Sequence, residues 1–377
     1  MVNSGFFHKQ LTEYGIGFFS GIPDSLLKDF CAYLTDNVPE KEHIIAANEG
    51  LAVGLACGYH LSTNRIPLVY MQNSGLGNSI NPLLSLADKK VYSIPLLLLI
   101  GWRGEPGVHD EPQHISQGEV TLSLLDAARI PYLILDSEEK NILPQLDKVF
   151  DYFRKENAPF ALVAKKETFS PYQLEKITKS ESFLSREDAI KAVLEQMDNN
   201  GIVVSTTGMI SRELYELRDQ KNQGHAQDFL TVGSMGHASQ IALGIALNKP
   251  EKMVYCFDGD GAMLMHLGGL STVGSNKPSN YVHIIFNNGA HDSVGGQPTV
   301  AEKINVQTLA ESLGYAFAAK ASSEEGIMTF FEALKSINEY PVLLEIMVKK
   351  GSRKNLGRPR TSPVENKKGF MRFLMED

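Results

Sequence analysis

Two apolar runs late in the chain constrain the fold more than any other feature, because each ends in a short polar sequence rich in glycine. The run over 253–257 is followed at once by Asp258-Gly259-Asp260-Gly261, and the run over 281–286 by Asn287-Asn288-Gly289. Between them, 262–271 reads as a helix and 275–280 as a turn region. This order predicts two parallel strands of one sheet. Their carboxyl ends would bring a carboxylate and a carboxamide to the sheet edge where α/β proteins bind ligands.

The residue types at this edge suit a divalent cation that carries a diphosphate. Carboxylate, amide and carbonyl oxygens are the hard ligands that Mg²⁺ prefers. A glycine-rich turn at a helix N-terminus lets backbone N–H groups approach a phosphate. An Asp that merely caps a helix would explain the Gly-Asp-Gly turn alone. It does not explain the turn together with an Asn-Asn pair that follows Gly261 after 25 intervening residues.

Composition restricts the class of protein. The chain has 377 residues, enough for two α/β domains, and its 43% hydrophobic content excludes disorder as the dominant state. A net charge of −8 argues against a general nucleic-acid-binding protein, although a local basic site for an anion is compatible with it. The three cysteines have no metal or redox spacing, and we find no signal-like or membrane-length segment. We therefore expect a cytoplasmic enzyme that binds no membrane.

The first half of the chain repeats the plan of the second. A strand over 67–71 ends in Gln72-Asn73-Ser74-Gly75, as the strand over 253–257 ends in its glycine-rich turn. A small-residue helix precedes each of these strands, and a second apolar strand follows each. The repeated helices and strands are expected at 51–60 and 239–249, at 67–71 and 253–257, and at 95–100 and 281–286. Further helices are expected at 3–14, 25–35, 77–87 and 185–197, and further strands at 44–45 and 202–205.

We therefore predict an α/β protein with two similar doubly wound, parallel-sheet domains. The first domain is expected over 1–165 and the second over 185–377. A polar, charge-rich linker over 166–184 would join them.

The Gly-Asp-Gly to Asn-Asn stretch resembles the signature of the thiamine diphosphate-dependent enzymes. The resemblance implies a pyrimidine-binding domain followed by a diphosphate-binding domain, with thiamine diphosphate and Mg²⁺ as cofactors. It assigns the metal ligands to Asp260, Asn287 and the carbonyl of Gly289. It also implies that His291 and its neighbours overlie the cofactor. Further cofactor contacts are implied for Thr206, Thr207, Gly208, Gly233, Met235, Gly259, Gly261 and Ala262.

Two of these assignments have ordinary alternatives. By resemblance, Gly233 would accept from the cofactor amine through its carbonyl, and Met235 would lie under the cofactor and hold it bent. A methionine more usually fills a core. Thr206 and Thr207 would contact the diphosphate, but hydroxyl side chains also cap loops.

Asn48-Glu49-Gly50, followed by a small-residue helix, resembles the signature of the pyrimidine-binding domain. Glu49 would then hydrogen-bond the ring nitrogen of the aminopyrimidine and so activate the cofactor. Taken alone, a Glu at a helix N-terminus is commonly a favourable partner of the helix dipole. The motif in the second half favours the catalytic role.

The substrate side is predicted from the loops of the first half and from a basic segment. His114, and after it His109, are candidate proton donors, although loop histidines are often merely solvated. Asp24 and Ser25 lie where related enzymes place an active-site acid. Arginines bind phosphate-like oxygens with two hydrogen bonds. The candidates for an anionic substrate are Arg103 and, in the basic segment 351–360, Arg353 and Arg358; a solvated basic tail is the alternative for that segment.

Over its whole length the chain resembles the compact, two-domain decarboxylases of this family, which lack a third domain, and among them the phosphonopyruvate decarboxylases. The stretches SGIPDSLLKDF, MQNSGLGNSINPL, DEPQHISQGE, NNGAHDSVGGQPT and GRPRTSPVENK carry the resemblance. It implies decarboxylation of 3-phosphonopyruvate, a small anionic keto acid, to phosphonoacetaldehyde and CO₂ in phosphonate biosynthesis. It also implies a homo-oligomer whose active sites lie between subunits.

Two alternatives stay open. Sulfopyruvate decarboxylases share the plan, and another 2-keto acid decarboxylase would use the same cofactor. A non-catalytic diphosphate-binding module would need a different explanation for Glu49, because such a module has no use for an acid at the pyrimidine position.

Overall fold

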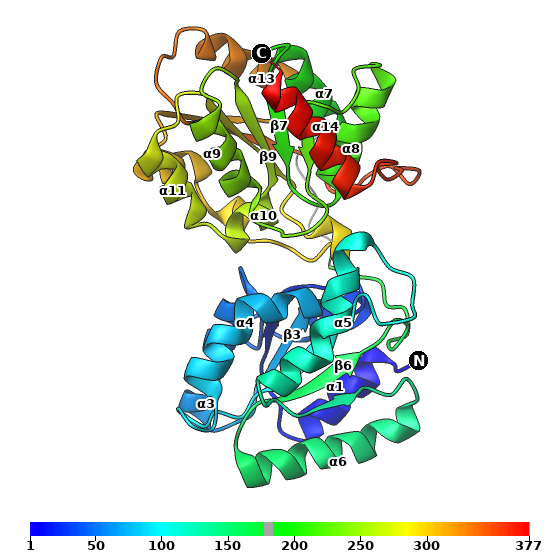
Figure 1. Cartoon of the computed structure of the whole chain (residues 1–377). Coiled ribbons are helices and arrows are strands. Elements are labelled where there is room, and N and C mark those ends of the chain that lie inside the picture. The colour runs from blue at the N-terminus through cyan, green and yellow to red at the C-terminus, as the bar shows by residue number, and fades with distance from the viewer. Residues whose placement is uncertain (177–183, 377) are drawn as a thin grey trace. The chain divides into compact units, whose positions relative to one another are not determined.

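The computed structural model describes residues 1–176 and 184–376, which form two compact units (Figure 1). The chain up to residue 176 builds the first unit together with the short segment Ser293–Gln297. The remaining described residues build the second unit. The linker predicted over 166–184 includes 177–183, which lie outside the described residues. Phe169, at the start of that predicted linker, packs in the core of the first unit.

The first unit is built on a six-stranded, all-parallel sheet with the strand order β2-β1-β3-β4-β6-β5. Helices α1, α2 and α6 pack on one face of the sheet, and the alternate side chains of the central strands are buried on the other. The strands are β1 (Phe19–Gly21), β2 (His43–Ile45), β3 (Leu68–Gln72), β4 (Leu97–Gly101), β5 (Tyr132–Ile134) and β6 (Phe160–Ala164). The helices are α1 (Ser4–Glu13), α2 (Lys28–Asn37), α3 (Glu49–Thr63), α4 (Leu76–Pro82), α5 (Pro112–Ala127) and α6 (Glu139–Glu156).

The second unit contains another six-stranded parallel sheet, with the order β11-β12-β10-β9-β7-β8. Helices α7, α8 and α13 cover one face, and α9, α11, α12 and α14 cover the other (Figure 1). The strands are β7 (Ile202–Ser205), β8 (Asp228–Leu230), β9 (Val254–Gly259), β10 (Tyr281–Asn287), β11 (Phe317–Ala321) and β12 (Val342–Met347). The helices are α7 (Arg186–Gln196), α8 (Met209–Gln220), α9 (Ala238–Asn248), α10 (Asp260–Met265), α11 (Gly269–Asn276), α12 (Val306–Ser312), α13 (Glu324–Leu334) and α14 (Pro363–Met375).

The two sheets have the same topology. When the strands of each half are numbered from one to six, both orders read 2-1-3-4-6-5. Both sheets are buried on two faces, which explains why their central strands are continuous apolar runs rather than alternating ones. The prediction of two similar doubly wound, parallel-sheet domains is confirmed. In such a sheet ligands bind beyond the carboxyl ends of the strands, where the strand order changes direction.

The local signals at the helix ends explain several accurate boundaries. Asn48 caps α3 by accepting a hydrogen bond from the backbone N–H of Leu51 at 3.0 Å, which places Glu49 in the first turn. Ser185 caps α7 in the same manner through Asp188. Side-chain acceptors at this position satisfy backbone donors that the helix itself leaves free.

The helix predicted over 262–271 is wrong at its centre. The chain forms α10 and then α11, with a break between Met265 and Gly269, and α11 continues to Asn276 into the predicted turn. His266 leaves the helical conformation, and the Gln240 side chain donates to the carbonyl of Gly269 at 2.9 Å. Consecutive glycines at 268 and 269 lower the helix propensity at this point. The helix predicted over 77–87 likewise changes, at Leu83, from α4 into one π turn. Among the described helices, none combines the length and apolar character needed to cross a bilayer.

Candidate active site

Glu49 lies at the start of α3 and is 5% exposed. Its Oε2 atom accepts a hydrogen bond from the Asn78 side chain at 2.7 Å. Gly75, in the short 3₁₀ turn Asn73–Gly75 that follows β3, provides the space for this carboxylate, because a Cβ there would lie 2.5 Å from Glu49 Oε1. The carboxylate is thus held in a fixed position at the carboxyl edge of the first sheet.

Four of the residues predicted for the substrate side lie together at the same edge. Asp24 follows β1, is fully buried and accepts from the backbone of Leu26 at 2.9 Å and from Gln72 Nε2 at 3.1 Å. Burial raises the pKa of Asp24 to about 6, against the opposing effect of its hydrogen bonds and of Arg103. Asp24 is therefore an acid that can change protonation near neutral pH.

Arg103 follows β4 and links Ser25 to the loop that precedes α5. Its guanidinium forms a two-point ion pair with Asp110, with Nε to Oδ2 at 2.8 Å, and donates to Ser25 Oγ at 2.7 Å. His114 lies at the start of α5, and its pKa is lowered to about 4 by burial and then by the nearby Arg103 charge. His114 is therefore neutral at physiological pH. His109 is exposed on the preceding loop.

The three predicted metal ligands are linked at the carboxyl edge of the second sheet. Asp260 follows β9, Asn287 ends β10, and the register of these neighbouring strands pairs Gly259 with Phe286. Thr299 connects two of the ligands: its hydroxyl donates to Asp260 Oδ2, and its backbone N–H donates to the carbonyl of Gly289 at 3.0 Å. The structure therefore brings together the three groups that the sequence singled out.

The surroundings of Asp260 fit a divalent cation. The carboxylate is 3% exposed, and burial raises its pKa to about 6. The groups that donate to it are neutral, namely the Thr299 hydroxyl and the backbone N–H groups of Gly261 and Asn288. A buried carboxylate is costly unless an opposite charge accompanies it. A bound cation at this edge would supply that charge.

The predicted cofactor-contact residues lie around the same edge. Thr206, Thr207 and Gly208 connect β7 to α8, and Gly208 has φ +96°, a conformation that only glycine adopts readily. The Thr207 hydroxyl is already engaged, because it donates to the carbonyl of Val232 at 2.8 Å. Gly259 ends β9, and Gly261 and Ala262 lie in the first turn of α10, which follows directly.

Met235 lies beside this turn. A Cβ on Gly261 would be 3.1 Å from the His291 ring and 3.4 Å from the Met235 methyl group, so both side chains border Gly261. Burial lowers the pKa of His291 to about 4, and the imidazole is therefore neutral. Gly233 lies two residues before Met235 on the same loop.

Asp292, which the sequence predicted to overlie the cofactor, is a part-buried acid that connects three segments of the second unit. It accepts from Arg186 at 3.3 Å, from the Asn288 side chain at 2.6 Å and from the backbone of Gly351 at 2.9 Å. Arg186 also forms a two-point pair with Glu213. Asp292 therefore ties the loop after β10 to the beginning of the basic segment 351–360.

The basic segment is packed against helices rather than free in solvent. Arg353 pairs with Glu187 of α7 and Glu216 of α8. Arg212 donates to the carbonyls of Leu356 and Gly357. Arg358 is exposed. An anionic ligand would have to compete with these two carboxylates for Arg353. The sequence around Arg353 did not indicate this competition.

Four residues of the site were missed by sequence reasoning. Asn78 contacts Glu49, Thr299 contacts Asp260, Glu345 contacts Asn287 at 2.7 Å, and Gly75 makes room for Glu49. Only Gly75 carried a signal, since it ends a strand that the repeat aligns with the Gly-Asp-Gly turn. The others are separated from their partners by 29 to 58 residues.

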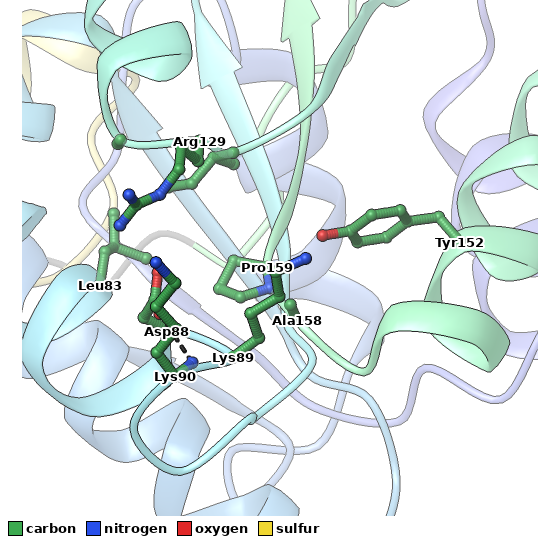
Figure 2. Close-up of a pocket in the computed structure, with 10 residues that line it drawn as sticks. Leu83, Asp88, Lys89, Lys90, Arg129, Tyr152, Ala158 and Pro159 are labelled. Atoms are coloured by element: carbon green, nitrogen blue, oxygen red, sulfur yellow. Dashed lines mark hydrogen bonds between the residues drawn. The ribbon is translucent and has the colours of Figure 1, made fainter.

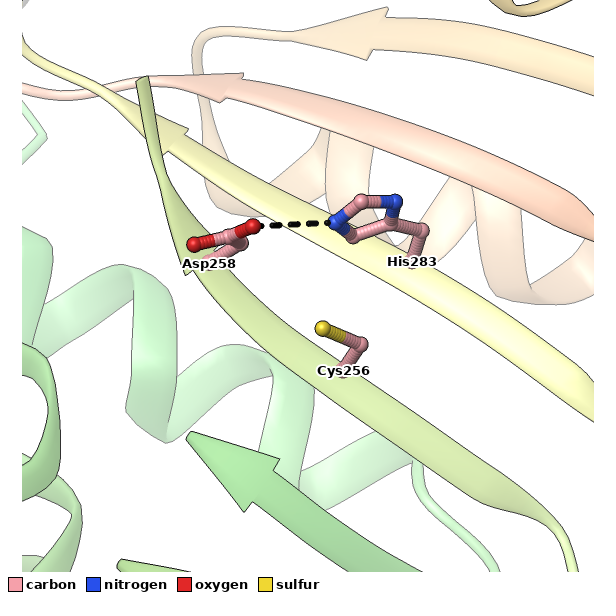
Figure 3. A group of neighbouring side chains, drawn as sticks. All are labelled: Cys256, Asp258 and His283. Atoms are coloured by element: carbon pink, nitrogen blue, oxygen red, sulfur yellow. Dashed lines mark ion pairs between the residues drawn. The ribbon is translucent and has the colours of Figure 1, made fainter. Parts of the chain in front are cut away.

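Two other features of the molecule involve residues that were not predicted for the site. A small cavity of about 50 Å³ lies near the amino ends of β5 and β6, lined by residues that include Lys89, Lys90 and Arg129 (Figure 2). Cys256, Asp258 and His283 form a buried cluster on the face of the second sheet that α9 covers (Figure 3). His283 pairs with Asp258 at 3.5 Å and contacts the Tyr315 hydroxyl at 3.1 Å.

Comparison with known proteins agrees with this geometry. Residues 4–126 match the family model of the thiamine pyrophosphate enzyme N-terminal TPP binding domain, and residues 206–346 match that of the C-terminal TPP binding domain. A phosphonopyruvate decarboxylase of Streptomyces viridochromogenes is 33% identical over 97% of this chain and 93% of its own length. A second, from Streptomyces hygroscopicus, is 31% identical over 97% and 92%. A sulfopyruvate decarboxylase of Methanosarcina acetivorans is 31% identical over 97% and 95%.

Proposed function

Since the chain belongs to the thiamine pyrophosphate-dependent enzyme family, we propose that it is a carboxy-lyase that converts 3-phosphonopyruvate to phosphonoacetaldehyde and CO₂. The observation that carries this proposal is the 33% identity to a phosphonopyruvate decarboxylase along nearly the whole chain. Sulfopyruvate is the second candidate substrate, because the sulfopyruvate decarboxylase relative covers the same share of the chain at 31% identity. Three free, buried cysteines support a reducing compartment, the cytoplasm.

The second unit supplies the residues that would hold the cofactor's diphosphate end. Bound thiamine diphosphate provides the electron sink that loss of CO₂ from a 2-keto acid requires. Asp260, Asn287 and the carbonyl of Gly289 would hold Mg²⁺, a cation whose preferred ligands are oxygens. The glycine-rich turn before α10 and the turn before α8 would face the diphosphate.

Glu49 would act at the pyrimidine end. Its carboxylate would hold a proton against the aminopyrimidine ring nitrogen, and the fixed position set by Gly75 and Asn78 would keep it there. Orientation of this kind contributes to rate because no freedom is lost at the moment of reaction.

Arg103, Asp24 and His114 would act on the substrate. The Arg103 guanidinium would bind the phosphonate with two hydrogen bonds in place of Asp110. His114, neutral because of its lowered pKa, can both donate and accept a proton, and would relay one to the product. Asp24, whose pKa of about 6 keeps part of it protonated, is a second proton reservoir at this edge.

We infer that the active enzyme is a homo-oligomer in which Glu49 and Asp260 of one site come from different subunits. Helix α3 supports an interface, because Leu51 and Leu55, which follow Glu49, are 55% and 39% exposed. Helix α9 exposes Leu247 at 48%. Exposed large apolar residues beside a site are typical of surfaces that a partner covers.

A mixing experiment tests this arrangement. Glu49→Gln and Asp260→Asn are each expected to inactivate the enzyme by themselves. If each site combines two chains, co-expressed variants form mixed dimers with one intact site, and about a quarter of the wild-type activity returns. No recovery in mixed oligomers would place both residues of a site in one chain.

The substrate and cofactor are tested directly with Glu49→Gln as the key variant. Wild-type enzyme should release CO₂ from phosphonopyruvate faster than from sulfopyruvate or pyruvate, and only with thiamine diphosphate and Mg²⁺ present. Glu49→Gln should lower turnover at least ~10³-fold while cofactor affinity changes little, because the loss is confined to activation. Preference for sulfopyruvate would change the substrate assignment but leave the proposed role of Glu49 intact. Near-normal turnover of the variant would contradict that role.

A further inference from the structure

We propose that Glu345 is a positioning residue that sets the orientation of the Asn287 amide and thereby the affinity of the site for its divalent cation. The proposal rests on the proposed function, since it takes Asn287 as a ligand of the cation that accompanies thiamine diphosphate. It assigns a role to a buried acid that belongs neither to the sequence motif nor to the ligand set.

Glu345 lies in the middle of the second sheet, beside the strand that carries Asn287. It is on β12, which runs parallel to β10 and pairs Ile285 with Glu345. Glu345 is 1% exposed and Asn287 is fully buried, and the Asn287 Nδ2 atom donates to Glu345 Oε1 at 2.7 Å. On the other side, Lys320 of β11 approaches Glu345 Oε2 at 3.3 Å. A relay of three side chains thus crosses three neighbouring strands.

The relay distinguishes the two ends of the Asn287 amide. An ionised carboxylate only accepts hydrogen bonds, so it must face the NH₂ end of the amide. The Oδ1 end is then turned away from Glu345, and it accepts from the backbone N–H of Gly289 at 3.0 Å. Oδ1 is the atom that a hard cation would bind. Without an acceptor at residue 345, only the backbone N–H of Gly289 would hold the amide in this orientation.

Lys320 provides an opposite charge beside the buried acid, because its Nζ atom lies 3.3 Å from Glu345 Oε2. The Lys320 side chain is 42% exposed, so its ammonium is hydrated while it neutralises Glu345. An apolar pair would fill this part of the sheet at lower cost in desolvation. A role in orienting the Asn287 ligand would explain why a charged pair, Glu345 and Lys320, occupies this position.

The experiment measures cation binding directly. Mn²⁺, a paramagnetic substitute for Mg²⁺, is titrated into enzyme with saturating thiamine diphosphate, and free Mn²⁺ is followed by electron paramagnetic resonance. Groups that orient a ligand from behind commonly contribute 10- to 100-fold to metal affinity. We therefore expect Glu345→Ala to raise the Kd for Mn²⁺ at least ~10-fold. Glu345→Gln, which can still accept from Asn287 but no longer excludes the flipped amide, should lie between it and wild type.

A double-mutant cycle separates positioning from general loosening. In an Asn287→Ala background the amide is gone, so Glu345→Ala should change the Kd for Mn²⁺ less than about twofold. Asp228→Asn is the matched control, because Asp228 is a buried acid of the same unit that pairs with Arg218. This variant should lose stability without a change in the Kd for Mn²⁺.

Each outcome decides the proposal. Unchanged Mn²⁺ affinity in folded Glu345→Ala or Glu345→Gln overturns it, as does the same loss in the Asn287→Ala background. If Glu345→Ala does not fold, Glu345→Gln carries the comparison. If wild-type enzyme with thiamine diphosphate binds no Mn²⁺, the metal assignment of the proposed function fails first, and this inference fails with it.

Discussion

Gly75→Ala should damage catalysis through a single contact, which makes it a sharp test of the position of Glu49. The backbone of Gly75 has φ −70° and ψ −14°, values that alanine adopts without strain. The added Cβ would, however, lie 2.5 Å from Oε1, 2.6 Å from Cγ and 2.7 Å from Cδ of Glu49. The Glu49 carboxylate must therefore move.

The size of the movement follows from these distances. To leave even a tight contact of ~3.0 Å, the carboxylate oxygen must retreat by about half an ångström, and an ordinary contact requires about twice that. The hydrogen bond from Asn78 at 2.7 Å would be broken or lengthened. Overpacking of this kind commonly costs ~1–3 kcal/mol of stability. Misplacement of a catalytic group by ~1 Å can cost about 100-fold in rate.

The assay is steady-state CO₂ release at saturating thiamine diphosphate and Mg²⁺, together with thermal unfolding. We expect Gly75→Ala to lower kcat about 10- to 100-fold. This decrease is larger than the stability loss alone would cause at the assay temperature. Gly77→Ala is the matched control, because Gly77 lies two residues later, at the start of α4, and a Cβ there would meet nothing within 4 Å. A Gly75→Ala enzyme with wild-type kcat would refute the idea that this carboxylate must stay where the structure places it.

Three further outcomes are expected. Arg103→Met should raise KM for phosphonopyruvate at least ~10-fold, because a charge-assisted pair contributes about 1.5–3 kcal/mol, and an unchanged KM would remove Arg103 from the anion site. Arg186→Met leaves the buried Glu213 and the part-buried Asp292 without their cation, so urea unfolding should show a loss of ~3–5 kcal/mol, and a loss below 1 kcal/mol would contradict the burial of the Arg186–Glu213 pair. Since the folded pKa of His114 is about 4 and its ordinary value is 6.5, the unfolded chain binds this proton first as pH falls. His114 therefore lowers the free energy of unfolding as pH falls from 6.5 to 4. Over this range the His114→Gln variant should lose less stability than the wild type. Equal losses would contradict the lowered pKa.

Sequence patterns predicted the sheet edges well because strand, turn and helix signals there are local. The apolar runs before Asp260 and Asn287 become β9 and β10, and the repeat correctly anticipated a second sheet with the same order. Glu49 was expected before a small-residue helix, and the Asn48 cap observed in the structure explains why that helix starts at Glu49. Each of these inferences needed only neighbouring residues or one regular spacing.

The remaining parts of the site depend on contacts that no local pattern encodes. Glu345 and Thr299 contact the predicted metal ligands from later segments of the chain, and only folding brings them near Asn287 and Asp260. Arg353 illustrates the opposite difficulty. Its charge was plain in the sequence, but its carboxylate partners, Glu187 and Glu216, lie 166 and 137 residues earlier. Charge alone therefore suggested a ligand where the fold had already provided partners.

Each sheet is built from strands of one half of the chain alone, and this has a consequence for how the protein can be divided. Every strand of each sheet comes from its own half of the chain, so a break between them would leave both hydrogen-bond ladders complete. Apart from Ser293–Gln297, the two compact units also follow one another along the sequence. Gene fission near residue 180 is thus expected to yield two polypeptides that assemble on co-expression. Such a split enzyme would allow each half to be labelled or varied independently.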